Sequence, residues 1–194
     1  MSRIFYLMGK SASGKDSVYR ELMKKFPFEK IIMYTTRPMR QDEKNGVQYY
    51  FTDESEYQKF LEDGKVIESR CYQTVHGPWI YYTVDDGKVQ REGKEQYLVI
   101  GTLESYEKMK NYYGGDMLVP VYLEVEDGLR LERALNREKI QSVPRYSEMC
   151  RRYLADEKDF SEERLKAAGI EKRFSNECME QCVEEITEYI RRIW

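Results

Sequence analysis

The chain has 194 residues, and no segment approaches the ~20 consecutive apolar residues that a membrane helix needs. Its 32 basic and 35 acidic residues give a net charge of −3, which excludes a purely electrostatic argument for binding nucleic acid or an anionic membrane. Four cysteines and one histidine, His76, favour free thiols over a disulfide scaffold or a zinc site. We therefore expect one cytoplasmic domain over residues 1–194, with neither nucleic acid nor a membrane as a partner, and with His76 in a loop.

The first elements are an apolar strand followed by an amphipathic helix. Residues 3–8 are mostly apolar, as a buried parallel strand is. Residues 14–26 follow as a helix whose apolar positions form one stripe. A second strand is predicted over residues 31–34.

The middle of the chain is rich in tyrosine and breaks this alternation. Residues 53–63 are predicted to form a helix that Asp53 caps and Gly64 ends. Strands are predicted over residues 65–70 and 79–84. We expect residues 35–84 to form a separate lobe.

The rest of the chain returns to alternating strands and helices. The predicted strands cover residues 96–101 and 117–125, and the predicted helices cover residues 103–113, 127–137, 147–160 and about 177–193. Strands that alternate with helices predict an α/β fold with a largely parallel sheet and crossover helices. The core is expected to comprise about residues 1–34 and 96–194.

The strongest motif lies between the first strand and the first helix. Residues 9–15, here called the phosphate loop, fit G-x-x-x-x-G-K and consist of Gly9, Lys10, Ser11, Ala12, Ser13, Gly14 and Lys15. Glycines let successive N–H groups point at phosphate oxygens, and the helix N-terminus adds a positive dipole. Lys15 would reach the outer phosphates of ATP. The alternative is a glycine-rich turn that binds nothing.

The position after Lys15 departs from the motif. A serine or threonine is expected there to meet Mg²⁺, but the chain has Asp16 followed by Ser17. A carboxylate is a good ligand for this hard cation. Either Asp16 or Ser17 is therefore the expected Mg²⁺ ligand when ATP is bound.

A second cluster of polar residues follows the predicted second strand. Two arginines, Arg37 and Arg40, precede Glu43 and Tyr49. Guanidinium forks and a phenol hydroxyl suit a phosphate dianion. Taken alone, the cluster is equally compatible with a solvated loop.

Together with the phosphate loop, this cluster resembles guanylate kinase. The family pattern T-T-R-x-P-R-x-x-E-x-x-G-x-x-Y-x-F is matched, with the proline displaced by one place, by Thr35, Thr36, Arg37, Arg40, Glu43, Gly46, Tyr49 and Phe51. The resemblance implies a P-loop kinase fold: a parallel core sheet flanked by helices, an inserted lobe that binds the nucleoside monophosphate, and a lid. It also implies ATP and GMP as small-molecule partners, with Mg²⁺.

The resemblance assigns the acceptor site residue by residue. Arg37, Arg40 and Tyr49 would hold the GMP phosphate, and Glu43 of the same motif is also expected among the GMP-binding residues. Glu68 would pair with guanine, because a carboxylate accepts from N1–H and N2–H₂, whereas adenine N1 is an acceptor. The family's later Tyr-Gly-Ser/Thr segment corresponds to Tyr81 and Thr83.

A lid is implied over about residues 137–152. Arg133 and Arg137 match the first arginine pair of the family lid, and Ser147, Glu148 and Arg152 resemble the remainder. Arg137 and Arg152 would approach the transferring phosphoryl group, with Arg151 as a competitor for the second role. The alternative is a charged helix face exposed to water.

Two departures keep other functions open. Met33 stands where the family has a serine that touches guanine, and the segment 100–102 (IGT) lacks the family's acidic residue. The resemblance implies ATP-dependent phosphorylation of GMP, or dGMP, to the diphosphate. The alternatives are a P-loop kinase for another small phosphorylated acceptor and a guanylate-kinase-like binding module without catalysis.

Overall fold

The centre of the protein is a five-stranded sheet in which all paired strands are parallel. The computed structural model describes residues 1–41, 43–74 and 77–194. The order β2-β7-β1-β8-β9 is formed by β1 (Arg3–Gly9), β2 (Glu29–Lys30), β7 (Gln96–Ile100), β8 (Leu118–Glu124) and β9 (Arg173–Ser175). The α/β class and the parallel core predicted from the sequence are therefore confirmed.

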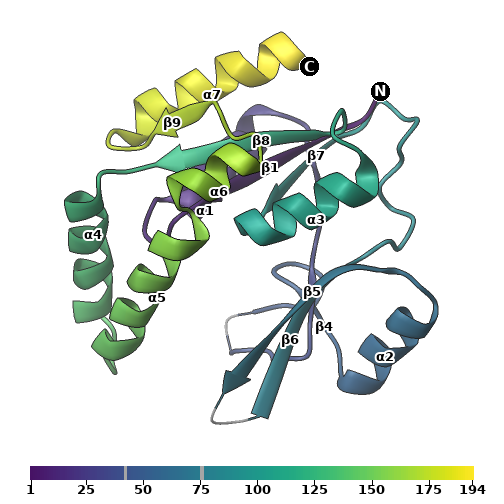
Figure 1. Ribbon diagram of the computed structural model, residues 1–194, viewed down its shortest axis with the longest axis horizontal. Helices are drawn as coiled ribbons and strands as arrows, with labels where there is room; N and C mark the ends of the chain where they lie inside the picture. The colour runs from purple at the N-terminus through teal and green to yellow at the C-terminus, as the bar shows by residue number, and fades with distance from the viewer. Residues whose placement is uncertain (42, 75–76) are drawn as a thin grey trace.

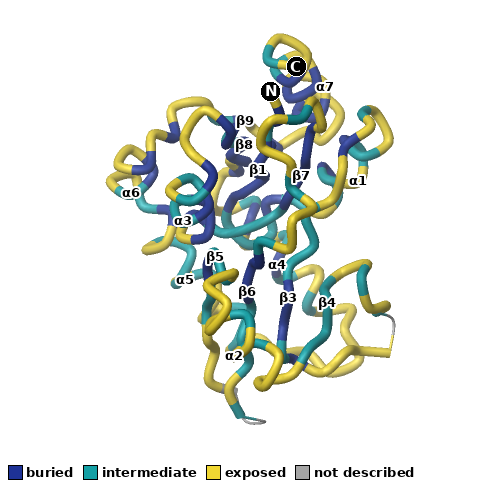
Figure 2. Tube along the Cα trace, turned by 90° about the vertical axis from the view of Figure 1, so that its right-hand side faces the viewer, coloured by how far each residue is buried: buried dark blue, intermediate teal, exposed yellow. Residues whose placement is uncertain are grey.

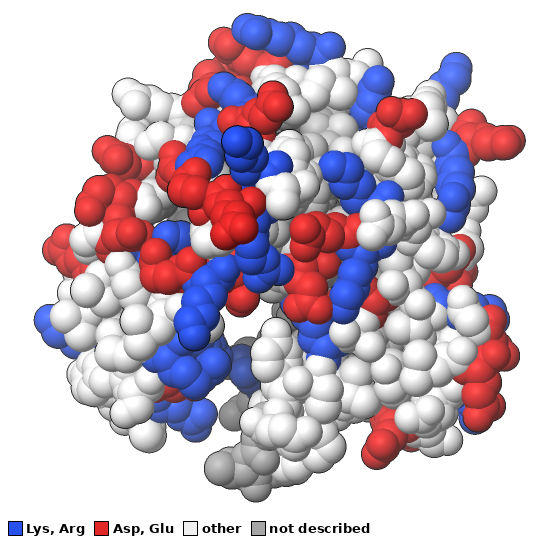
Figure 3. Space-filling model, in the orientation of Figure 1, with Lys and Arg blue, Asp and Glu red and all other residues white. Residues whose placement is uncertain are grey.

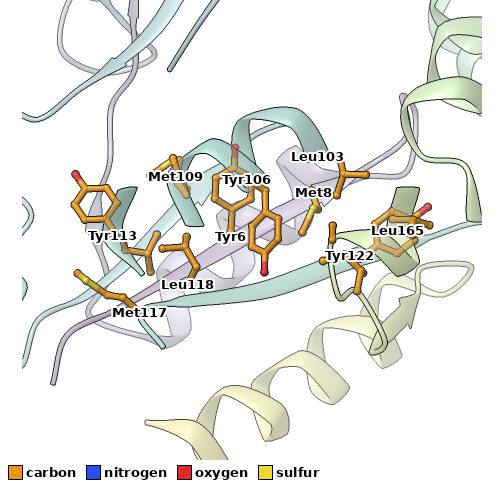
Figure 4. Close-up of a cluster of buried hydrophobic side chains, with 14 of the residues drawn as sticks. Tyr6, Met8, Leu103, Tyr106, Met109, Tyr113, Met117, Leu118, Tyr122 and Leu165 are labelled. Atoms are coloured by element: carbon orange, nitrogen blue, oxygen red, sulfur yellow. The ribbon is translucent and has the colours of Figure 1, made fainter. Parts of the chain in front are cut away.

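Helices cover both faces of this sheet (Figure 1). The helices α1 (Lys15–Lys25) and α7 (Met179–Ile193) pack on one face, and α3 (Leu103–Tyr113) and α6 (Glu162–Ala167) pack on the other. The helices α4 (Asp127–Lys139) and α5 (Tyr146–Asp159) pack against each other and extend beyond the end of the sheet (Figure 1). Side chains alternate across β1: Tyr6 faces the cluster with α3, and Leu7 faces the cluster with α1 and α7. Figure 4 shows the first cluster, and Figure 2 shows the central strands as the most buried part of the trace.

A second, smaller sheet lies below the core in Figure 1. Its order is β4-β3-β6-β5, formed by β3 (Tyr34–Thr35), β4 (Tyr50–Phe51), β5 (Val66–Thr74) and β6 (Gly77–Val84), and α2 (Glu54–Glu62) packs beside it. Its buried centre is small, with Tyr34, Tyr82 and Val84 at its heart. Aromatic rings therefore make up most of the buried centre of this lobe.

The prediction of a core strand over residues 31–34 was wrong. The strand that pairs with β7 is β2, and the backbone bond from Ile31 N to Leu98 O is already 3.5 Å long. Tyr34 belongs to the second sheet, because its ring packs against Tyr50 and Tyr82 there. The chain thus leaves the core before residue 34.

Several short elements had no counterpart among the predictions: β2, β4, α6 and β9. By contrast, α3 begins and ends at the predicted residues, with Thr102 as its cap. The expectation for His76 falls outside the described residues. The described cysteines are free, and no helix within the described ranges is long and apolar enough to cross a membrane.

Candidate functional site

The phosphate loop joins β1 to α1, and its shape depends on two glycines and one asparagine. Gly14 has a φ of 87°, in the left-handed region, and a Cβ there would overlap the Asn176 side chain. A Cβ on Gly9 would lie 2.6 Å from a carbonyl oxygen of β8. Buried Asn176 donates from Nδ2 to the carbonyl oxygen of Ser13 at 2.7 Å. The loop is therefore held between the start of α1 and the end of β9, in the arrangement that binds anions.

Lys15 points back into this loop. Its Nζ donates to the carbonyl oxygens of Gly9 at 2.7 Å and Lys10 at 2.9 Å. Burial lowers the pKa of Lys15 to about 8, and the carboxylates of Asp156 and Asp16 oppose that shift. A bound phosphate would oppose it further by adding negative charge.

Carboxylates of α5 contact the phosphate loop from the other side. The backbone N–H of Ser11 donates to Asp156 Oδ2 at 2.7 Å, and Lys10 Nζ lies 2.9 Å from both carboxylate oxygens of Glu157. Buried Arg130 of α4 pairs with both carboxylates. The Asp156 carboxylate therefore accepts a hydrogen bond from a backbone N–H of the phosphate loop, which is the kind of group that binds phosphate oxygens.

Asp16 and Ser17 lie in the first turn of α1, beside the loop. Asp16 is exposed, and Ser17 Oγ accepts from Arg20 at 3.4 Å. Both side chains offer oxygen atoms next to the phosphate loop, which fits a hard divalent cation. The structure does not favour one over the other.

The second cluster gathers around Arg37, which is only 3% exposed. Its guanidinium donates to both carboxylate oxygens of Glu43, at 2.9 and 2.7 Å, and lies 5.8 Å from the centre of the Tyr49 ring. Tyr81 packs edge-on against Tyr49, and Glu43 also accepts from the backbone N–H of Arg40. Arg37, Tyr49 and Tyr81 thus share one site, whereas the side chain of Arg40 is exposed beside it.

Glu68 and Thr83 face each other across the β5–β6 pair. Thr83 donates to Glu68 Oε1 at 2.8 Å, and both residues are buried. Arg70 lies on the same strand, with Nε 3.3 Å from Glu68 Oε2. Its NH1 donates to Thr102 at 3.2 Å, and its NH2 lies 4.0 Å from the sulfur of Met33.

The predicted lid arginines separate into two groups. Arg137 and Arg152 line a pocket of about 120 Å³ together with Ser11 of the phosphate loop. Arg133 faces away, because its guanidinium donates to the backbone carbonyls of Asn176 and Glu177. It therefore anchors α4 to the segment after β9.

Glu148 binds both candidate arginines of α5. It accepts from Arg151 at 2.7 and 2.8 Å and from Arg152 at 2.9 Å. These hydrogen bonds, those of Arg151 first, lower the pKa of Glu148 to about 2. Neither arginine is singled out by its contacts, although Arg152 alone of the two lines the pocket.

A hollow of about 380 Å³ beside the phosphate loop is not where transfer would be expected. It touches Lys10 and Ser13, but most of its charged lining is acidic: Glu124, Glu126, Asp127, Glu162 and Glu177. Carboxylates repel phosphate oxygens. The smaller, arginine-lined pocket matches the charge of a nucleotide phosphate better.

The phosphate loop and the Glu68–Arg70 pair lie near neighbouring strand ends. Leu7 of β1 pairs with Ile100 of β7, so Gly9 and Thr102 follow adjacent strands at the same edge of the sheet. Arg70 reaches that edge through Thr102. Figure 3 shows a hollow between the α4–α5 side and the second sheet, bordered by lysines and arginines.

Sequence reasoning missed several residues that build this site, among them Arg70, Arg130, Asp156 and Asn176. Asp156 lies four residues after Arg152, so helical spacing alone would have placed both on one face of α5. The contacts of the others join segments far apart in the chain, and no local pattern signals them.

Comparisons with known proteins agree with this geometry. A family model described as guanylate kinase matches residues 1–111. Guanylate kinase of Nitrosomonas europaea is 40% identical over 78 residues, which cover 40% of this chain and 37% of that protein. Guanylate kinase 1 of Arabidopsis thaliana is 30% identical over 73% of this chain and 38% of its own length.

Longer matches are less similar in sequence. Guanylate kinase of Malacoplasma penetrans is 27% identical over 90% of this chain and 81% of its own length. The crystal structure of guanylate kinase from Anaplasma phagocytophilum has a TM-score of 0.70 and 18% identity, over 98% of this chain and 85% of that one, which shows the fold. Because the family model spans more than half of the chain, this protein is a member of the guanylate kinase family.

Proposed function

We propose that this protein transfers the terminal phosphate of ATP to GMP, forming ADP and GDP. The observation that carries the proposal is that two anion sites meet at one sheet edge: the phosphate loop after β1 and the Arg37–Tyr49–Glu68 cluster, which reaches β7 through Arg70 and Thr102. One site suits a donor triphosphate, and the other suits an acceptor monophosphate.

On the donor side, backbone N–H groups of the phosphate loop bind the ATP phosphates, and Lys15 neutralises their charge. Asp16 or Ser17 holds Mg²⁺, which offsets phosphate charge when it is bound. Arg137 and Arg152 supply the lid charges, since both line the pocket that includes Ser11.

On the acceptor side, Arg37, Arg40 and Tyr49 bind the GMP phosphate, with Tyr81 packed against Tyr49. Glu43 orients the Arg37 fork, because both guanidinium ends donate to its carboxylate. Glu68 accepts from the guanine edge, and Thr83 holds the Glu68 carboxylate in place through its hydroxyl.

The chemistry needs no general base, because the acceptor phosphate is already an anion. Catalysis then consists of bringing two phosphates together and neutralising their charge as the phosphoryl group moves. Closure of residues 137–152 over the donor would exclude water, which otherwise competes as the acceptor.

A coupled ADP-release assay over GMP, dGMP, AMP, CMP, UMP and a sugar monophosphate tests the proposal. We expect turnover with GMP, at least tenfold above AMP. Turnover with another acceptor in preference to GMP would contradict the assignment of the acceptor. Binding of GMP without turnover, at saturating ATP and Mg²⁺, would contradict catalysis.

A further inference from the structure

Arg70 lies in the acceptor site, although nothing in the motif pattern assigns it a role. Its guanidinium contacts Glu68 of its own strand, Thr102 at the start of α3 and Met33 from the segment before β3. Burial raises the pKa of Tyr49, and Arg37 and Arg70 both oppose that shift from nearby. Arg70 therefore lies near Tyr49 as well as beside Glu68.

Glu68 and Arg70 have unused hydrogen-bonding capacity side by side. Glu68 Oε2 and Arg70 Nε are buried and 3.3 Å apart, yet their alignment makes no hydrogen bond, and neither atom has another partner among the described residues. A buried carboxylate oxygen and a buried N–H without hydrogen bonds cost free energy. Binding of a ligand that forms hydrogen bonds with both is therefore favoured. The side chain of Met33, which lies beside Arg70, has no N–H or O–H to donate.

The two side chains differ in their exposure to solvent. The side chain of Arg70 is 13% exposed, whereas that of Glu68 is fully buried. Arg70 is therefore the more accessible member of the pair.

We infer that Arg70 is a specificity-determining residue that donates a hydrogen bond to O6 of guanine while Glu68 accepts from N1–H and the 2-amino group. Together the two side chains present acceptor, acceptor and donor groups, which complement the donor, donor and acceptor groups along that edge of guanine. Arginine donors to guanine O6 are common in base recognition. Adenine carries an amino group at position 6, so Arg70 would face a donor there. This inference rests on the proposed function, because it requires the acceptor base to bind beside Glu68.

Three nucleotides separate the contributions of the two residues. GMP has O6, N1–H and the 2-amino group, IMP lacks only the 2-amino group, and 2-aminopurine ribonucleoside 5′-monophosphate keeps the 2-amino group but lacks both O6 and N1–H. Dissociation constants for all three are measured by calorimetry, with 2-aminopurine fluorescence as a second readout for the third. Binding is measured separately from turnover, so failure of the GMP kinase assignment and failure of the Arg70 assignment give different results.

The test compares the wild-type protein with Arg70→Met. We expect the dissociation constants of GMP and IMP to rise about 10- to 100-fold, and that of the 2-aminopurine nucleotide to change less than about threefold. Arg192→Met is the control, because Arg192 is exposed on α7 and pairs only loosely, at 3.6 Å, with Glu188. This variant should bind all three nucleotides as the wild type does.

Equal losses for the three nucleotides would overturn the inference, because they would mean that Arg70 only supports the fold through Thr102. Unchanged binding of all three would overturn it as well, as would wild-type protein that binds the 2-aminopurine nucleotide as tightly as GMP. If Arg70→Met does not fold, Arg70→Lys keeps the charge beside Glu68 but lacks the planar fork. Its loss for GMP and IMP must then exceed its loss for the 2-aminopurine nucleotide by at least about threefold.

Discussion

The proposed donor and acceptor sites of this protein are built in different ways. The phosphate loop is a short continuous segment, and its binding groups are backbone N–H groups and one lysine that follow directly from β1 and α1. The acceptor cluster combines side chains from β5, β6 and the segments around β3, and it rests on the N-cap of α3. The first depends on backbone geometry, and the second on the packing of distant side chains.

In both sites, carboxylates of the protein already accept hydrogen bonds from the groups that are proposed to bind phosphate. Asp156 accepts from the loop N–H of Ser11, and Glu43 accepts from both ends of the Arg37 fork. A nucleotide must therefore compete with carboxylates on the donor side, whereas on the acceptor side Glu43 can stay and orient its arginine. The two sites should respond differently to removal of charge, and the following experiments test this difference.

The largest effect is expected for Lys15→Met. The ammonium group matters most while charge shifts in the transition state, so kcat should fall by about 10²-fold or more with little change in melting temperature. Steady-state kinetics with ATP and GMP measure this, and Lys24→Met is the control, since Lys24 is exposed on the same helix. Unchanged turnover would remove the phosphate-loop assignment.

Glu68→Gln should mainly affect recognition of the acceptor base. The amide places a donor opposite a guanine donor, so kcat/KM for GMP should fall roughly 10- to 200-fold, while AMP loses far less. Arg40→Ala should weaken all monophosphates alike, because an exposed arginine beside the phosphate cluster does not read the base. A GMP:AMP ratio that stays the same in Glu68→Gln would show that Glu68 has no part in specificity.

The pKa of Lys15 predicts how ATP binding depends on pH. With a pKa of about 8 in the free protein, ATP binding should weaken about tenfold from pH 7 to pH 9 as the ammonium loses its proton. The unfolded chain keeps this proton up to about pH 10.4, so this group makes folding more favourable as pH rises from 8 to 10. Titrations with ATP at several pH values between 7 and 9 measure the dissociation constant. A dissociation constant that does not change with pH would contradict the prediction.

The smallest effect is expected for Asp156→Ala. Removing the carboxylate frees the Ser11 N–H and takes negative charge away from the loop, so the dissociation constant of ATP should fall about 2- to 10-fold. Asp159→Ala, an exposed change on the same helix, should have no effect. Weaker binding of ATP with Mg²⁺ in Asp156→Ala would indicate instead that Asp156 assists the metal.

The sequence by itself determined the regular parts of this protein. The apolar run before Gly9, the G-x-x-x-x-G-K spacing and the helical pattern of residues 103–113 each depend on neighbouring residues, so β1, α1 and α3 lie at or within about one residue of their predicted bounds. The motif around Arg37 pointed to Glu43 and Tyr49 in the same way, and the three side chains are indeed in contact.

Only the tertiary structure decided which distant groups meet. The hydrogen bond from Arg70 to Thr102 links two elements 32 positions apart, and the contacts of Asn176 with the phosphate loop and of Asp156 with Ser11 join segments from opposite ends of the chain. Short elements such as β2 and β9 form because a neighbouring strand offers hydrogen bonds, and their own sequences carry no strong preference. Local propensity is set by a few adjacent residues, whereas the partner of a buried charge is set by how the whole chain packs.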